Sequence, residues 1–204
     1  MNQAVERTQR RSSQRTRPVS FLCPTCKASL EIDSKWCPVC NFTGGDTIGM
    51  FSNSPPPLLP LLDAVGIWNP SEVNKIETSR IHLSRRFPQF KWRVCCVKLP
   101  PNTDLSVFGF WLLNVCPLHD KETSEERAWT VMLLIDVESC QAAAIPGYAA
   151  EACLGDDQWR ESLHAMAIPW KSGKTADAVV AFFKTCRKQL DEFWKRHGAR
   201  SSNK

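Results

Sequence analysis

The sequence predicts an α/β fold in which helices cover both faces of a short, central, mixed sheet, preceded by a small ribbon built around four cysteines. Three observations support this prediction. Two Cys-Pro-x-Cys pairs lie close together near the N-terminus, helical patterns alternate with strand-like runs over residues 69–197, and the run AWTVMLLIDV is almost entirely apolar. Helices separated by strands are typical of a sheet with helices packed on its faces.

The composition is that of a globular protein without a membrane span. The chain has 204 residues, of which 43% are hydrophobic and 23% are charged, enough for one medium domain and a small one. No run reaches the roughly 18 apolar residues of a membrane helix, and the polar N-terminus lacks the apolar core of a secretory signal. We therefore expect no transmembrane segment and a cytoplasmic location.

The positive charge is concentrated at the N-terminus. Residues 1–20 hold five of the 26 basic residues and one of the 21 acidic residues, so the remainder of the chain is nearly neutral. We interpret residues 1–20 as a disordered basic tail, and residues 198–204 as a second disordered tail. The alternative use of the basic tail is contact with nucleic acid.

The four-cysteine motif comes first in the chain after the tail. Cys23 and Cys26 form one pair and Cys37 and Cys40 the other. Each Cys-x-x-Cys turn places two thiolates on one side of a metal ion, and two turns complete the tetrahedron that zinc prefers. The spacing thus predicts a structural zinc ribbon over residues 21–43, with a short β-hairpin in the segment between the two pairs and a turn near residues 33–34.

The remaining cysteines do not suggest a disulfide framework. They lie mostly in apolar segments, as buried thiols do: Cys95, Cys96, Cys116, Cys140, Cys153 and Cys186. This usage fits a reducing compartment. Cys116 and His119 have Cys-x-x-His spacing, which we interpret as a coincidence of loop sequence because no further ligand is apparent.

A linker follows the ribbon. Residues 44–68 contain Gly44-Gly45 and the run Pro55-Pro56-Pro57, which predict irregular structure and a semi-rigid spacer between two domains.

The larger domain, residues 69–197, opens with a helix that has clear boundaries. Asn69 is placed to cap it, Pro70 occupies its first turn, Glu72 completes a capping box, and Pro88 ends it. The run FKWRVCCVKL then alternates apolar and polar residues and predicts a strand. Asp104 is placed to cap a second amphipathic helix.

The second half of the domain contains two strands and two helices. After a charged loop over residues 116–127, the apolar run 128–137 predicts a central strand covered on both faces. Residues 140–148 predict its antiparallel return. Asp156 or Asp157 is expected to cap the next helix, and residues 175–196 form the last amphipathic helix.

The stretch LLIDVESCQAAAIPGYAAEACLGDDQW resembles the centre of the TPM domain, a family named for proteins of photosystem repair in plants and a modulator of acetylcholine receptors in animals. Residues 133–136 match its apolar strand and acidic residue, and residues 147–151 match its glycine turn, with Ala149 in place of the usual second glycine. The resemblance covers about residues 70–195. It implies a short sheet with helices on both sides, and it makes divalent-metal binding and weak acid phosphatase activity expectations.

Four acidic residues could serve such a site: Asp136, Glu151, Asp156 and Asp157. They follow two neighbouring strands, and clustered carboxylates suit calcium or magnesium. The alternative is structural, with Asp156 and Asp157 capping a helix, Asp136 ending a strand and Glu151 making a local hydrogen bond.

Three functions follow from these observations. The first is a ribbon-bearing, TPM-like accessory or interaction protein with a structural zinc, a protein partner and no assembled catalytic site. The second is a divalent-metal-dependent phosphatase, a hydrolase that uses the acidic residues. The third is a nucleic-acid binder that uses the ribbon and the arginine-rich tail. We expect the first, because the sequence does not assemble a nucleophile, a base and an electrophile.

Overall fold

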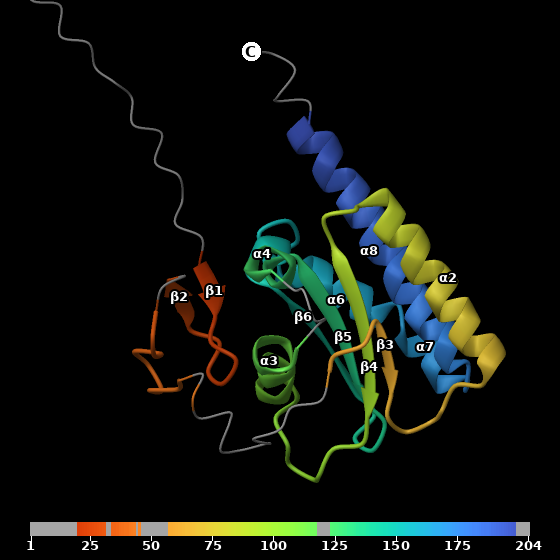
Figure 1. Cartoon of the computed structure of the whole chain (residues 1–204), viewed down its shortest axis with the longest axis horizontal. Coiled ribbons are helices and arrows are strands. Elements are labelled where there is room, and N and C mark those ends of the chain that lie inside the picture. The colour runs from red at the N-terminus through yellow and green to blue at the C-terminus, as the bar shows by residue number, and fades with distance from the viewer. Residues whose placement is uncertain (1–19, 32–33, 44, 46–56, 118–122, 199–204) are drawn as a thin grey trace, which may run out of the picture.

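The computed structural model describes residues 20–31, 34–43, 45, 57–117 and 123–198 (Figure 1). Most of the predicted basic tail, much of the linker and all but the first residue of the C-terminal tail lie outside these residues. Within the described part of the chain, no helix combines the length and the hydropathy needed to cross a bilayer.

A four-stranded mixed sheet forms the centre of the larger domain. Its strands lie in the order β3 (Leu61–Asp63), β4 (Lys91–Val97), β5 (Thr130–Asp136) and β6 (Gln141–Pro146). β3, β4 and β5 are parallel, and β6 returns antiparallel to β5. The predicted central strand and its return strand are thus confirmed, and β6 forms one edge of the sheet.

β3 lies in the stretch that was predicted as linker. Only three residues long, it is too short to show an alternating pattern in the sequence. It forms because the buried strand β4 offers a pairing partner, with Leu61 opposite Val94 and Asp63 opposite Cys96. The Asp63 carboxylate then accepts hydrogen bonds from the backbone of Gly66 and Trp68, which turns the chain toward the first long helix.

Helices cover both faces of this sheet, as predicted (Figure 1). α2 (Pro70–Arg86), α6 (Asp156–His164) and α8 (Thr175–Gly198) pack on one face, and α3 (Leu105–Val115) packs on the other. The side chains of β4 alternate between the two cores. Trp92 and Val94 face α2 and α8, whereas Cys95 and Val97 face α3. All seven residues of β5 are buried, as expected for a strand covered on both faces.

The helix starts follow the sequence signals closely. The Asn69 side chain accepts from the Glu72 backbone at 3.0 Å, and the Glu72 carboxylate accepts from the Asn69 backbone, also at 3.0 Å, which completes the capping box of α2. The Asp104 carboxylate accepts from two backbone N–H groups at the start of α3. Both predicted caps are confirmed.

The charged segment before β5 is partly helical rather than a plain loop. α4 (Ser124–Ala128) begins with a second capping box, formed by Thr123 and Glu126. The Arg127 guanidinium donates to the carbonyls of Leu113 and Cys116 at the end of α3, where the last helical carbonyls need partners. The capping box and the arginine hydrogen bonds together stabilise a helix that is too short to show a periodic pattern in the sequence.

Three shorter helices connect β6 to the long last helix α8: α5 (Tyr148–Glu151), α6 and α7 (Ala167–Lys171). The expectation that Asp156 or Asp157 caps α6 was wrong, because Gly155 is the capping residue and the Gln158 side chain accepts from its N–H at 3.0 Å. The two aspartates lie in the first turn instead, where the helix dipole favours negative charge.

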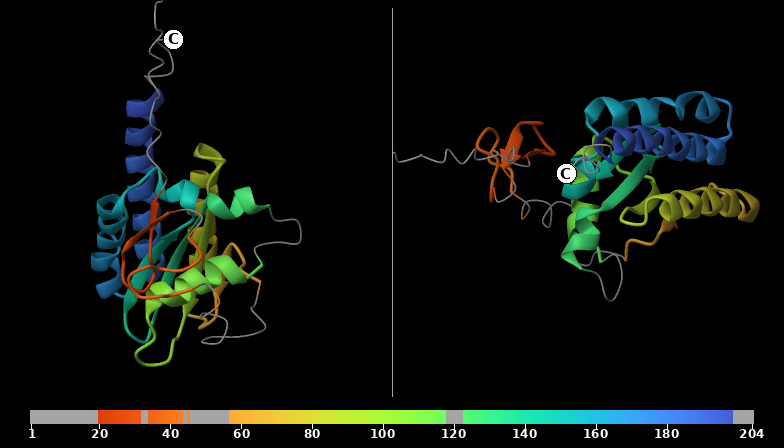
Figure 2. Two further views of the ribbon diagram at one scale, coloured as in Figure 1. Left: turned by 90° about the vertical axis from the view of Figure 1, so that its left-hand side faces the viewer. Right: turned by 90° about the horizontal axis from the view of Figure 1, so that it is seen from above.

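The ribbon is a separate small unit beside α3 (Figure 2). β1 (Ser20–Leu22) and β2 (Ser29–Glu31) pair antiparallel and enclose the first Cys-x-x-Cys turn. A hairpin was expected between the two cysteine pairs. A strand does form there, but its partner precedes Cys23, because the first turn itself reverses the chain.

Candidate functional site

The two cysteine turns of the ribbon have the same backbone structure. In the first, the Cys23 N–H donates to the Ala28 carbonyl and the Lys27 N–H to the Cys23 carbonyl; the Cys37 turn repeats both bonds with Phe42 and Asn41. Lys27 and Asn41 have φ values of 61° and 59°, in the left-handed region. This conformation closes each turn so that both of its sulfurs face the same point.

The four sulfurs converge as the sequence predicted. All four Sγ atoms lie within 4.8 Å of one another, and Cys23 to Cys40 and Cys26 to Cys37 are 3.7 Å and 3.5 Å apart. These separations are far longer than a disulfide bond of about 2.05 Å, and the cysteines are free. The arrangement can therefore hold one metal ion with four thiolates, which leaves no open position for a catalytic water.

The ribbon packs against the larger domain beside this metal site. The ring of Phe42, which follows the second cysteine turn, meets Phe110 of α3 edge to face, with 5.7 Å between the centroids. The backbone N–H of Leu22 hydrogen-bonds to Glu151 of α5. Residues on both sides of the four-cysteine motif thus contact two different helices of the larger domain.

A cleft of about 780 Å³ lies between the ribbon, α3, β6 and the helices that follow β6. Its volume falls within the range of typical ligand sites. Its lining is mostly apolar and comes from five parts of the chain: the ribbon (Leu22, Pro24 and Lys27), α3 (Ser106, Phe110, Leu113 and Asn114), α4, the strand segment 142–146, and the segment 147–163. No single element would form this cleft alone.

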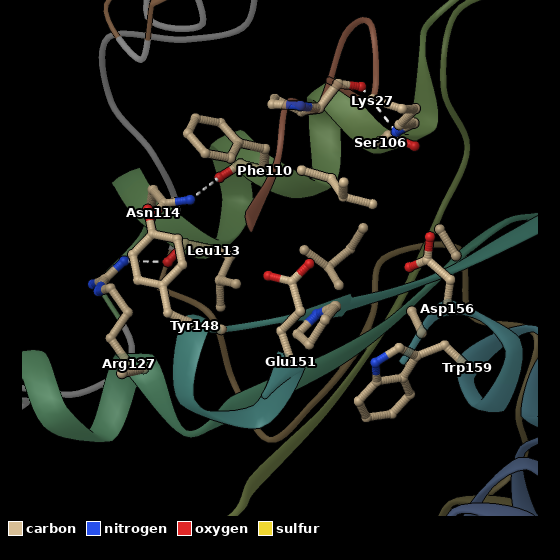
Figure 3. A pocket seen from close by; sticks show the side chains of 18 of the residues that line it. Lys27, Ser106, Phe110, Leu113, Asn114, Arg127, Tyr148, Glu151, Asp156 and Trp159 are labelled. Atoms are coloured by element: carbon tan, nitrogen blue, oxygen red, sulfur yellow. Dashed lines mark hydrogen bonds between the residues drawn. The ribbon is translucent and has the colours of Figure 1, made fainter. Parts of the chain in front are cut away.

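The polar groups of the cleft are few and unevenly placed (Figure 3). The Glu151 carboxylate points into the middle of the cleft, Asp156 and Trp159 lie on one side of it, and Tyr148 and Arg127 on the other. Burial, followed by the charge of Asp156, raises the pKa of Glu151 to about 7, although the hydrogen bond from Leu22 lowers it. Glu151 is therefore a carboxyl group that changes charge near neutral pH.

Trp159 contributes a buried polar atom to the same cleft. Its side chain is 5% exposed, and its indole nitrogen has no hydrogen-bond partner among the described residues. Figure 3 shows this nitrogen on the side of the ring that faces Glu151 and Asp156. Buried donors are nearly always paired in folded proteins, so this N–H marks a place where an acceptor is missing.

The four acidic residues predicted as a second site do not come together. Asp136 pairs with Gln141 at one end of the β5–β6 hairpin, whereas Glu151 and Asp156 follow Pro146, which pairs with Val131 at the other end. The five residue-to-residue steps from Val131 to Asp136 separate the two ends by about 17 Å. The prediction overlooked that the C-terminal ends of two antiparallel strands lie at opposite ends of the strand pair.

Asp136 has a structural environment at its own end. Its carboxylate accepts from the Leu99 backbone at 3.1 Å and from the backbone and hydroxyl of Ser139. Burial disfavours its charge, but these hydrogen bonds outweigh burial and hold the pKa of Asp136 below its ordinary value. The carboxylate thereby joins β5, the end of β4 and the turn into β6.

Asp157 is exposed and does not line the cleft; its carboxylate lies 3.6 Å from the Arg160 guanidinium. Glu151 and Asp156, by contrast, both line the cleft. In the described part of the chain, the four ribbon cysteines are the one group of at least three potential metal ligands that converge.

Four of the other cysteines are buried (Cys95, Cys96, Cys116 and Cys186), whereas Cys153 is partly buried and Cys140 is exposed. Burial raises the pKa of Cys95 and Cys96 to about 12, and that of Cys116 to about 11. Such thiols are poor nucleophiles because the thiolate is the reactive form. His119, which was paired with Cys116 by spacing, lies outside the described residues.

Sequence reasoning missed the cleft residues from α3 and β6. Asn114 and the alanines at 142–144 carry no motif, and their position follows only from the packing of the ribbon near β6. One signal was available: three consecutive alanines in an edge strand leave little side chain to cover its free edge.

Comparisons with known proteins relate this chain to others by fold. No protein-family model matches the sequence, and no curated protein has significant sequence similarity to it. The structure is similar to the solution NMR structure of the N-terminal domain of a protein from P. gingivalis, with a TM-score of 0.50, 13% identity, and coverage of 65% of this chain and 82% of that one.

The NMR structure of the BA42 protein from the psychrophilic bacterium Bizionia argentinensis aligns with a TM-score of 0.47 and 14% identity over 64% of this chain and 86% of that one. At such low identity, the likeness to the P. gingivalis domain concerns the fold alone. The larger part of this chain, a four-stranded mixed sheet with helices on both faces, therefore shares its fold with that domain.

Proposed function

We propose that this chain is an interaction protein in which a structural zinc ribbon and a TPM-like α/β domain together form a binding cleft for a protein partner. The observation that carries the proposal is the cleft itself, because residues of the ribbon and of the α/β domain line it jointly. A ribbon that served only as a separate folding unit would have no reason to contribute Leu22, Pro24 and Lys27 to a cavity of this size.

Zinc is the metal that the donor set favours. A tetrahedral zinc–thiolate site has Zn–S bonds of about 2.3 Å, which places neighbouring sulfurs about 3.8 Å apart. The sulfur separations of 3.5 Å and 3.7 Å fit this geometry. Four thiolates saturate the ion, so its contribution is to fold the ribbon and thereby to hold one wall of the cleft in place.

The TPM-like assignment rests on the sequence resemblance over about residues 70–195, supported by the order of strands and helices. Gly147, the glycine of the matching turn, is required by close packing, because a Cβ there would lie 2.4 Å from the Arg127 carbonyl. The phosphatase alternative lacks support from the geometry, since Asp136 lies far from Glu151.

A capture experiment with a blocked cleft tests the proposal. Asn114 is exposed on α3 at the cleft wall, so Asn114→Trp fills the cleft while preserving the core. Lys188→Trp, on an exposed position of α8 away from the cleft, is the matched control. Proteins captured from the source cells by each chain are quantified by mass spectrometry. The partner captured by the wild type and by K188W should be much less abundant in the capture by N114W. Equal capture by all three chains would contradict a role for the cleft.

A further inference from the structure

The free edge of β6 opens into the cleft. The Gly147 N–H donates to the Thr130 carbonyl at 2.7 Å, so position 147 faces β5. Because backbone direction alternates along a strand, positions 141, 143 and 145 also face β5, and positions 142, 144 and 146 face outward. β6 is the last strand of the sheet, and residues 142–146 all line the cleft.

This edge presents a defined set of backbone groups. Ala142 and Ala144 each offer an N–H and a carbonyl, and Pro146 offers a carbonyl, since proline has no N–H to donate. Among the described residues, no backbone or side-chain group bonds to the outward side of Ala142 or Ala144. An unpaired edge with small side chains is a template on which an extended peptide can add as a further strand.

The charged groups of the cleft indicate the kind of peptide. Three cations line it: Lys27 donates to the neutral Pro24 carbonyl, Arg127 donates to neutral carbonyls at the end of α3, and Arg160 lies near the Asp157 carboxylate. Glu151 and Asp156 have no cationic partner among the described residues, and the charge of Asp156 bears on Glu151. Hydrogen bonds to neutral carbonyls leave the charges of the lysine and the arginine in place, so the cleft as a whole is not acidic. The immediate surroundings of Glu151 are acidic, because Asp156 acts on its pKa and no cation does.

The position of these carboxylates matches the end of the free edge. Glu151 lies in α5, directly after the Pro146 end of β6, and Figure 3 shows its carboxylate extending into the cleft. The unpaired indole N–H of Trp159 lies nearby, where a peptide carbonyl would supply the missing acceptor. The outward-facing backbone groups of β6 thus end close to the two carboxylates and the unpaired indole N–H.

We infer that the cleft binds an extended, basic segment of a partner protein, which pairs with the outward edge of β6 and places a Lys or Arg side chain beside Glu151 and Asp156. This inference rests on the proposed function and specifies the partner's chemistry. The backbone pairing supplies affinity independent of sequence, and the carboxylates supply the preference for a basic residue.

A selection experiment tests this inference. Random short peptides are displayed on phage and selected for binding to the full chain. Selected peptides should share one basic residue, and replacing an arginine there with neutral citrulline should weaken binding about tenfold. Glu151→Gln should remove this preference for arginine over citrulline. Glu192→Gln, which changes an exposed carboxylate of α8 outside the cleft, is the matched control and should leave the preference intact.

Two measurements test the strand pairing. Ala144→Pro removes an N–H that faces away from β5, so the sheet keeps its ladder while the peptide loses a partner; binding should fall about tenfold or more. N-methylation of alternate residues of a selected peptide should abolish binding for one set of alternate positions and not for the other, and it requires no change to the protein. Equal effects at both sets would overturn the strand pairing.

The remaining outcomes separate this inference from the proposed function. If no peptide is enriched while partner capture still depends on Asn114, the inference is wrong and the cleft binds its partner by other means. If peptides are enriched only on a chain carrying Arg15→Ala and Arg17→Ala, the occupant is the chain's own basic segment, and the assignment to a partner protein is overturned.

Discussion

At the scale of single residues, the two ends of one hairpin show how position decides what a carboxylate does. Asp136 is surrounded by N–H and O–H donors, and its pKa is held below the ordinary value, so it remains charged as a structural acceptor. Glu151 sits in a mostly apolar cleft near another carboxylate, and its pKa rises to about 7. Asp136 is the last residue of β5 and Glu151 lies in the short helix after β6, so nearness to a strand end does not by itself distinguish their roles.

The raised pKa of Glu151 predicts a specific dependence of stability on pH. Between its ordinary value of 4.5 and about 7, the folded chain binds this proton and the unfolded chain does not. The free energy of unfolding should therefore fall as pH rises through this window. Glu151→Gln should remove this component and stabilise the protein at pH 8 by about 1 kcal/mol, a value reduced for the partial exposure of the side chain.

Urea denaturation at a series of pH values from 4.5 to 8 measures this effect for the wild type and for E151Q. Asp157→Asn serves as the control, because the Asp157 side chain is 91% exposed and should leave the pH profile unchanged. A profile for E151Q that is parallel to that of the wild type would show that Glu151 titrates normally.

At the scale of elements, the crossing of α4 and the β6–α5 turn depends on one glycine. A Cβ at Gly147 would lie 2.4 Å and 2.6 Å from the carbonyl oxygens of Arg127 and Ala128. These are backbone atoms, which cannot turn aside as a side chain could. The φ of Gly147 is −74°, so close approach rather than a special conformation requires glycine here.

Gly147→Ala should therefore destabilise the protein by about 2 to 3 kcal/mol through overpacking. Gly155→Ala is the matched control, because its Cβ would meet only the flexible Gln158 side chain, at 3.1 Å. Chemical denaturation of the two variants beside the wild type measures the difference. A loss in G147A no larger than that in G155A would mean that α4 moves aside easily.

At the scale of the whole molecule, the ribbon and the α/β domain differ in what holds them together. The larger domain has two extensive apolar cores, one on each face of its sheet. Among the ribbon residues whose burial is described, the apolar core consists of Cys23, Leu30 and Cys37, with Ala28 and Phe42 partly buried. Such a small core does not sustain a fold alone, so the proposed metal ion at the four cysteines is expected to supply much of the stability of the ribbon.

Removal of the metal should thus unfold the ribbon and spare the sheet. Titration with a thiol-blocking reagent should release one zinc ion per chain, and hydrogen exchange should then rise in residues 20–43 and around Glu151, which loses its bond from Leu22. Exchange in β4 and β5, buried between the two cores, should remain slow. Loss of protection in β5 would show instead that the two units fold as one.

The sequence by itself determined the features that depend on neighbours along the chain. The spacing of Cys23, Cys26, Cys37 and Cys40 predicted their convergence, and Asn69 with Glu72 predicted the start of α2. The apolar run of β5 predicted a strand covered on both faces. In each case the relevant contacts lie within one short segment of the chain, at most 17 positions for the cysteines, or the burial follows directly from composition.

Only the tertiary structure decided which distant residues share a site. The three residues of β3 became a strand because β4 was available to pair with them, and Asp136 was separated from Glu151 because β6 runs antiparallel to β5. The cleft exists because the ribbon packs beside the free edge of β6. The pairing of a three-residue strand and the packing of two units are properties of the assembled chain, which no local pattern of residues encodes.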